Sequence, residues 1–217
     1  MNPRLRAVAR ASVRTVNTPL ARRRMDRALA GQPRPLNLEI GGLKPREGWL
    51  VTNVNALARN YLDATSTWPL APGDVANVYA DNVIEHIPLE GTRALLAEAH
   101  RCMRPGGVIR LITPDVRAHV ELYLAGRESL QGAAAQHYRG MGLTVEHPID
   151  VLRIPIGEFG HHTGYVFDFE TLAAELTDAG FRDVVQCPAG QSEHEVMAGL
   201  DVRSHEGGAQ LAVEAVR

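Results

Sequence analysis

Residues 36–55, "LNLEIGGLKPREGWLVTNVN", decide which fold the chain is expected to have. An apolar run ends at Ile40, a Gly41-Gly42 pair follows, and a second apolar run begins at Leu50. A dinucleotide site needs a glycine-rich turn that opens a full helix, because the N-terminus of that helix holds the pyrophosphate. The segment between Gly42 and Leu50 leaves no room for such a helix. It therefore predicts a nucleotide-type turn that holds something other than a diphosphate.

Apolar runs and helical stretches alternate through the rest of the chain. The runs bounded by turn residues are 36–40, 50–54, 75–80, 108–112, 181–187 and 210–216. Helical spacing is found at 90–104 and again after Asp168, a helix cap, as far as Ala179. Strands without strict polar alternation, joined by helices, predict an α/β fold with a parallel sheet that is covered on both faces.

The pattern loosens between Val116 and Tyr165, where one or two helices and a loop rich in His, Gly and Pro are expected. This stretch is too long for a plain connection. We expect 116–165 to be a lid or a substrate-shaping insertion within a domain that spans residues 36–217.

Bulk composition limits the class of protein. With 217 residues, of which 45% are hydrophobic, the chain can bury one good-sized core with a small appendage. No apolar run approaches the ~20 residues needed to span a bilayer. Cys102 and Cys187 fit neither a metal-cluster spacing nor a disulfide framework, so the sequence predicts a soluble protein of the reducing cytoplasm.

A basic arm, residues 1–35, precedes the domain. Residues 1–36 carry nine arginines and one acid, Asp26, so this part has a charge of +8 while the remainder has −10. A first helix with an apolar face and a second helix from Thr18-Pro19 to Gly31 are expected. One interpretation is an arm that contacts an anionic surface, with the inner face of a membrane as the partner; the other is a helix pair packed on its own acidic body. Nucleic acid is not the expected partner, because the body shows no aromatic and basic face.

The lysine content excludes several kinds of cofactor-binding site at the glycine turn. Lys44 is the only lysine, which excludes a P-loop, a pyridoxal Schiff base and the Tyr-x-x-x-Lys pair of short-chain reductases. A ligand whose charged end is an amino acid needs only close backbone approach at Gly41-Gly42 and partners for an ammonium and a carboxylate. S-adenosylmethionine is such a ligand.

Five blocks in the expected order carry a resemblance to a known family. They are "LEIGG" (38–42), "DATSTWPL" (63–70), "YADNVIEHI" (79–87), "HRCMRPGGVIRLITPD" (100–115) and "HHTGYVFDFETLAAELTDAGFRDV" (161–184). Over about residues 36–217 the chain resembles the class I S-adenosylmethionine-dependent methyltransferases, in particular small bacterial members of the methyltransferase type-11 kind. The resemblance implies a Rossmann-like, doubly wound, mostly parallel seven-stranded sheet with one antiparallel strand near its edge. It also implies methyl transfer from S-adenosylmethionine to a small-molecule acceptor, for which we consider a sugar or a lipid-linked molecule.

The resemblance also assigns cofactor contacts, and the sequence departs from the family at two of them. The residues assigned are Glu39, Gly41, Gly42, Asn55, Asp63, Ala64 and Asn82. The usual Gly-x-Gly is reduced to Gly41-Gly42, and Asn55 or Asn53 replaces the acid that binds the ribose. The alternatives are a plain tight turn at the glycines and an ordinary loop acid at Asp63. If the cofactor assignment holds, Gly41→Val should block the ligand and leave the fold intact.

His86 and His161 are the candidate catalytic bases. Methyl transfer to a hydroxyl or protonated amine needs a base, and His suits that task near neutral pH. The alternative for His86 is a structural role. A metal site that joins His161-His162 with His194 or Glu193 has no supporting ligand spacing, so no metal is predicted. The alternative function is a non-catalytic pseudo-methyltransferase that acts as a binding or scaffold protein.

Overall fold

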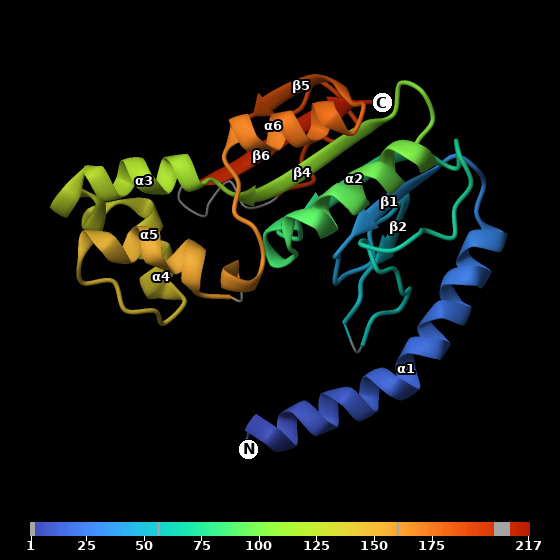
Figure 1. The fold of residues 1–217 in the computed structure, drawn as a ribbon, viewed down its shortest axis with the longest axis horizontal. Helices are drawn as coiled ribbons and strands as arrows, with labels where there is room; N and C mark the ends of the chain where they lie inside the picture. Colours follow the sequence, from blue (N-terminus) through green and yellow to red (C-terminus); the bar gives the residue numbers. More distant parts are fainter. Residues whose placement is uncertain (1–2, 56, 160, 202–208) are drawn as a thin grey trace.

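Six strands form one sheet in the computed structural model, which describes residues 3–55, 57–159, 161–201 and 209–217. For residues 3–14 and 162 only the backbone is described. The strand order is β2-β1-β3-β4-β6-β5 (Figure 1). The strands are β1 (Leu36–Ile40), β2 (Trp49–Thr52), β3 (Val75–Asp81), β4 (Val108–Pro114), β5 (Arg182–Cys187) and β6 (Gln210–Val216).

The direction of the strands agrees with the expected Rossmann-like class. β1 pairs in parallel with β2 and β3, and β3 pairs in parallel with β4. β6 is antiparallel to both of its neighbours, β4 and β5. The prediction of a mostly parallel sheet with one antiparallel strand near its edge is confirmed.

The expected seventh strand is absent from the described residues, and β2 is the edge of the sheet on that side. The described residues of this part of the chain, 53–55 and 57–74, make turns and one isolated bridge, between Asn53 and Tyr61. The reason lies in their side chains. Asn53, Asn55 and Asp63 each accept a hydrogen bond from the backbone N–H two residues further on, at 2.8–3.0 Å. Such Asx turns compete with strand formation.

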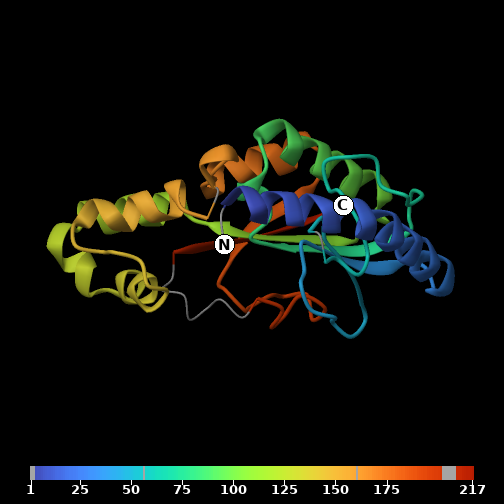
Figure 2. The ribbon, with the colours of Figure 1, turned by 90° about the horizontal axis from the view of Figure 1, so that it is seen from below.

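Helices cover one face of the sheet and loops cover the other (Figure 2). α2 (Leu89–Cys102) and α6 (Phe169–Asp178) lie on the first face, where Leu38, Val78 and Leu111 belong to the main apolar core. The connections 41–48 and 188–201 lie on the second face, which carries a small apolar cluster of Tyr79, Ile112 and Ala212 beside charged residues. Within the described residues, the expectation of a doubly wound sheet with helices on both faces is therefore wrong.

The second face contains a fully buried guanidinium. Arg110 on β4 forms ion pairs with Asp201 at 2.9 Å and with Glu214 on β6 at 2.6 Å, and its side chain has no exposed surface. It also donates to the carbonyl of Gln191 at 3.0 Å. Desolvating a charge costs several kcal/mol, roughly, unless partners surround it, and here the partners come from the sheet and from the loop. The network thus holds residues 188–201 against the sheet.

The N-terminal residues form one helix, α1 (Pro3–Gly31), in place of the two helices expected. Pro19 lies inside it and does not end it, although a proline removes one helix hydrogen bond. The second half packs on the body: Met25 is buried, and Arg24 donates to the carbonyl of Arg59 at 2.7 Å. Val16 is exposed, and the rest of the expected apolar face lies outside the described side chains. Among the described helices, none has the length and apolar character that a membrane span requires.

Residues 116–165 form more helix than expected. The helices are α3 (Val116–Leu124), η2 (Gly126–Gln131), α4 (Ala133–Gly140), α5 (Pro148–Gly157) and η3 (His161–Thr163), where η denotes a 3₁₀ helix. The expectation of one or two helices is wrong, because short helices with their own apolar cluster fill this region. Asp115 begins α3 by accepting a hydrogen bond from the N–H of Ala118. The unit therefore projects from the carboxyl end of β4 (Figure 1).

Arg110→Met should lower the free energy of unfolding by about 3–5 kcal/mol, because Asp201 and Glu214 would stay buried without their partner. Chemical denaturation measures this. Arg117→Met is the matched control, since Arg117 makes only an exposed pair with Glu170. A glutamate-specific protease should also cleave the Arg110 variant faster at Glu193 and Glu195. Equal stability of the two variants would contradict the role of the network.

Candidate functional site

The carboxyl ends of β1, β3 and β4 meet at one edge of the sheet. Gly41 follows β1, Asn82 follows β3, and Asp115 follows β4. Open α/β sheets bind their ligands at this edge. Two neighbouring cavities lie there. Asp81 lines one of them and the next residue, Asn82, lines the other.

The glycine turn after β1 is tightly packed. Gly41 has φ +79°, and a β-carbon there would overlap Cγ2 of Val83. A β-carbon at Gly42 would come within 2.6 Å of the Glu39 carboxylate. Asn53 donates to the carbonyls of Gly41 at 2.7 Å and Gly42 at 3.2 Å. The turn needs both glycines for its own packing, so the expectation that Gly41→Val leaves the fold intact is wrong.

Charges of both signs surround this turn. Glu39 is almost fully buried and pairs with Arg46 at 2.6 Å. The Arg46 guanidinium lies over the Tyr79 ring, 5.4 Å from its centroid. Burial opposes the charged form of Arg46, but the hydrogen bond to Glu39 holds the pKa of Arg46 above its ordinary value. Together with Lys44 and Asp81, the Glu39 and Arg46 side chains line a cavity of about 390 Å³.

Three of the other assigned cofactor residues do not line this cavity. Asn55 lines an adjoining cavity of about 490 Å³ along the edge strand β2, which shares residues 42–46 with the first, and its Oδ1 accepts from Leu57 N–H. Asp63 lines a separate cavity of about 270 Å³, partly formed by α1, and its Oδ1 accepts from the backbone and hydroxyl of Thr65. Ala64 is buried. These contacts support the loop-acid interpretation of Asp63.

The second cavity at the carboxyl edge has a volume of about 350 Å³ and is lined by histidines and aromatic residues. Asn82, which the sequence assigns to the cofactor, lies here with φ +51°. Its Oδ1 is buried and has no hydrogen-bond partner among the described residues. Sequence analysis missed Tyr138, Phe159 and Gln210, which also line this cavity, because no pattern connects these distant positions.

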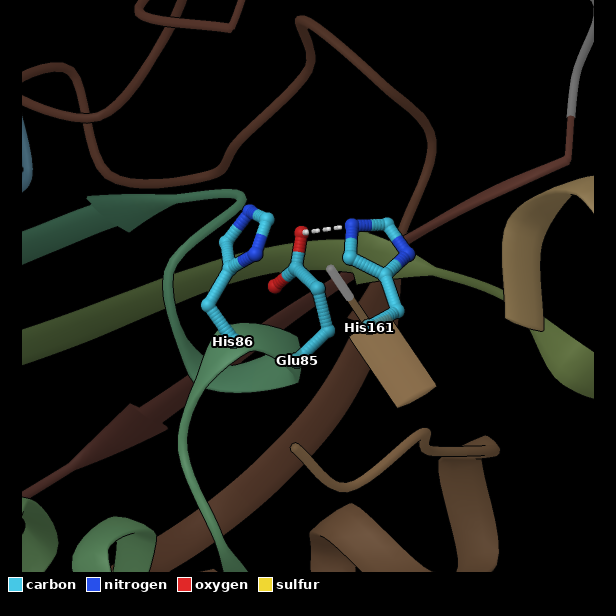
Figure 3. A group of neighbouring side chains, drawn as sticks. All are labelled: Glu85, His86 and His161. Carbon is cyan, nitrogen blue, oxygen red and sulfur yellow. Dashed lines mark ion pairs between the residues drawn. The ribbon is translucent and has the colours of Figure 1, made fainter. Parts of the chain in front are cut away.

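His86 and His161 come together with Glu85 at this cavity (Figure 3). Glu85 and His86 lie on η1 (Ile84–His86), directly after β3, and His161 lies on η3. The two imidazole rings are 4.6 Å apart between centroids, and Nε2 of His161 is 4.0 Å from Oε1 of Glu85. The His161 Nδ1 is 2.7 Å from the carbonyl of Pro155.

The three side chains differ in burial and charge. The Glu85 side chain is fully buried and the His161 side chain is 5% exposed, whereas His86 is exposed. Thr113 donates its hydroxyl to Oε2 of Glu85 at 3.3 Å. Partial burial, followed by the charge of His161, lowers the pKa of His86 below its ordinary value of 6.5. His86 is therefore neutral at pH 7 and able to accept a proton.

A glycine explains how η3 reaches η1. A β-carbon at Gly164 would overlap the backbone carbonyl of Glu85. Gly164 thus lets the segment that carries His161 lie directly against the backbone of Glu85 and His86. The signal in the sequence is the glycine in "HHTG", but the sequence alone does not show what it contacts.

No protein-family model matches the chain, and no curated protein matches it. Among solved structures, it is similar to phosphoethanolamine N-methyltransferase 2 of Haemonchus contortus in complex with S-adenosyl-L-methionine. The TM-score is 0.48 at 15% identity, and the match covers 93% of this chain and 52% of that one. The chain thus spans about half the length of that protein.

Two further similar structures match over most of both chains. One is a SAM-dependent methyltransferase from Archaeoglobus fulgidus, with a TM-score of 0.45, 15% identity, and coverage of 92% and 94%. The other, from Thermotoga maritima, is described as a SAM-dependent methyltransferase and possible histamine N-methyltransferase, with a TM-score of 0.44, 16% identity, and coverage of 94% and 97%. All three are described as methyltransferases. At such TM-scores and identities, the function of this chain rests on its own residues.

Gly164→Ala should cost about 1–3 kcal/mol of stability, as overpacking a close contact does, and should move His161 away from Glu85. Thermal denaturation measures the loss. Gly157→Ala is the matched control, because no atom lies within 4 Å of the position its β-carbon would take. If both variants melt at the same temperature, the close packing of η3 on η1 is refuted.

Proposed function

We propose that the chain transfers a methyl group from S-adenosylmethionine to a small-molecule acceptor. The observation that carries the proposal is the position of the charged glycine turn after β1 next to the histidine cavity, with Asp81 and Asn82 at their junction. A donor in the first cavity and an acceptor in the second would meet at the end of β3. Methyl transfer needs such an in-line arrangement.

The charged residues that line the first cavity suit the amino-acid end of S-adenosylmethionine. Glu39 and Asp81 supply negative charge for an ammonium, and Lys44 and Arg46 supply positive charge for a carboxylate. On binding, the ammonium of the ligand would pair with Glu39 and its carboxylate with Arg46. These two ion pairs would replace the pair between Glu39 and Arg46. Charge-assisted hydrogen bonds of this kind are about twice as strong as neutral ones.

S-adenosylmethionine supplies a methyl group on a positively charged sulfur, so the chain has to hold the acceptor, exclude water and accept a proton. His86 is the better placed of the two candidate bases. Its side chain is exposed to the cavity and neutral, whereas His161 is buried with Nδ1 against the Pro155 carbonyl. We therefore assign proton acceptance to His86 and the positioning of the cluster to His161.

The acceptor cavity favours a small hydroxylated molecule. Its walls combine the rings of Tyr138 and Phe159 with the amides of Asn82 and Gln210. Gln210 Oε1, like Asn82 Oδ1, is buried without a hydrogen-bond partner among the described residues, so both can accept from hydroxyl groups. A sugar presents such groups. If the sugar is lipid-linked, the basic helix α1 would add contact with an anionic membrane.

A non-catalytic binding protein is the second candidate. Two observations favour it: Arg46 already pairs with Glu39, and Asp63 lines a cavity apart from the one that Glu39 and Asp81 line. Such a protein would hold a ligand in the histidine cavity and would not bind S-adenosylmethionine.

Titration calorimetry with S-adenosylmethionine and S-adenosylhomocysteine separates the two candidates. We expect both to bind, and methylthioadenosine, which lacks the amino-acid end, to bind far more weakly. Glu39→Gln should weaken binding about 10- to 100-fold, the effect of losing a hydrogen bond to a charged group. Glu47→Gln is the matched control, because Glu47 lies in the same connection but is exposed. If the wild-type chain binds neither ligand, the methyltransferase proposal fails.

The pH dependence of turnover tests the role of His86. Because the pKa of His86 is lowered, His86 stays deprotonated at neutral pH. With an acceptor found by screening for S-adenosylhomocysteine release, turnover should be level through pH 7 and fall only below pH 6.5. His86→Ala should lower turnover roughly 100-fold or more and change cofactor affinity little, as removal of a general base does. An unchanged rate would show that the acceptor arrives already nucleophilic.

A further inference from the structure

We infer that Glu85, His86 and His161 form a binding site for a divalent transition-metal ion that opens onto the histidine cavity. One carboxylate oxygen and one ring nitrogen from each histidine all lie within 4.8 Å of one another. Figure 3 draws the Glu85 carboxylate between the two imidazole rings. The inference does not depend on methyl transfer, since it rests on these three side chains alone.

The hydrogen bonding of His161 is the main argument. Its Nδ1 lies 2.7 Å from the Pro155 carbonyl, which can only accept, so Nδ1 carries the proton and donates it. The other ring nitrogen, Nε2, lies 4.0 Å from Oε1 of Glu85. Both atoms can ligate a metal ion, and they face each other in a buried place. A cation between them would be held by both.

The surrounding contacts are those that support metal ligands. Metal-binding histidines commonly donate their other N–H to a backbone carbonyl, as His161 does to Pro155. Ligating carboxylates are themselves hydrogen-bonded, as Glu85 is by Thr113. Gly164 holds η3 against η1, so the ligands are brought together by backbone packing.

The donor set selects the class of metal. Two imidazoles and one carboxylate suit zinc or iron(II), whereas calcium and magnesium prefer oxygen ligands alone. Zn–N and Zn–O bonds of about 2.0–2.2 Å in tetrahedral geometry place ligand atoms about 3.3–3.6 Å apart, so binding would draw the three side chains closer together. Three protein ligands leave a fourth position, which a catalytic zinc keeps open. Here it would face the cavity and take an oxygen of the acceptor.

The competing explanation is a plain ion pair in which His161 carries both protons. That arrangement also satisfies Nε2 and Oε1, and it predicts no specific metal binding.

His86 would lose its role as the base if it were a ligand, because its lone pair would be on the metal. A loss of turnover in His86→Ala is expected under both explanations, so metal binding has to be measured directly.

The test uses the full chain freed of metal by a chelator and titrated calorimetrically with Zn²⁺. We expect one site per chain with micromolar or tighter affinity, and visible absorption bands when Co²⁺ replaces Zn²⁺. His86→Ala and Glu85→Gln should each weaken Zn²⁺ binding at least tenfold. His137→Ala is the matched control, because His137 lines the same cavity outside the cluster.

Two results would overturn the metal site. One is a wild-type chain that binds no Zn²⁺; the other is Zn²⁺ binding that His86→Ala leaves unchanged. His86 is exposed, so its variant should stay folded even if the change at the buried Glu85 destabilises the chain. Failure of Zn²⁺ binding with intact S-adenosylmethionine binding would leave the proposed function standing with His86 as the base.

Discussion

The connection between β1 and β2 is the constraint on which the rest of the structure depends. Parallel strands usually need a crossover of about a dozen or more residues, commonly a helix. Residues 41–48 make the crossover alone, which is feasible because an extended segment of eight residues can span about 26 Å. The chain therefore returns across one face of the sheet without a helix, and loops cover that face in place of helices.

The consequence is a sheet whose two faces are stabilised by different forces. Helices bury the main apolar core on the first face, whereas ion pairs and a small apolar cluster attach loops to the second. Arg46 joins the 41–48 connection to Glu39, and Arg110 joins the 188–201 loop to the sheet. Buried charges must be paired, so each pair selects one position for its loop. Because the 41–48 connection contains no helix, it brings Arg46 next to Glu39 at the glycine turn. The two opposite charges there are the ones that the proposed ligand would contact.

The second site depends on backbone contact more than on charge. η1 follows β3 at once, and η3 returns from the helical unit that follows β4. Their close approach requires the absence of a side chain at Gly164. Glu85, the exposed His86 and the buried His161 thereby lie together at the carboxyl edge of the sheet. The proposed proton transfer and the proposed metal binding both involve the ring nitrogen of His86.

The sequence by itself determined the local features: the positions of the six strands within a few residues, the helix cap at Asp168, and the turn at Gly41-Gly42. These follow from periodicity and from hydrogen bonds between near neighbours, which a sequence displays. Only the tertiary structure decided the missing seventh strand, the unbroken helix at Pro19, the charged face around Arg110 and the meeting of Glu85 with His161. Those outcomes depend on which distant segments pack together. The residue pattern within one segment does not show which other segment it will pack against.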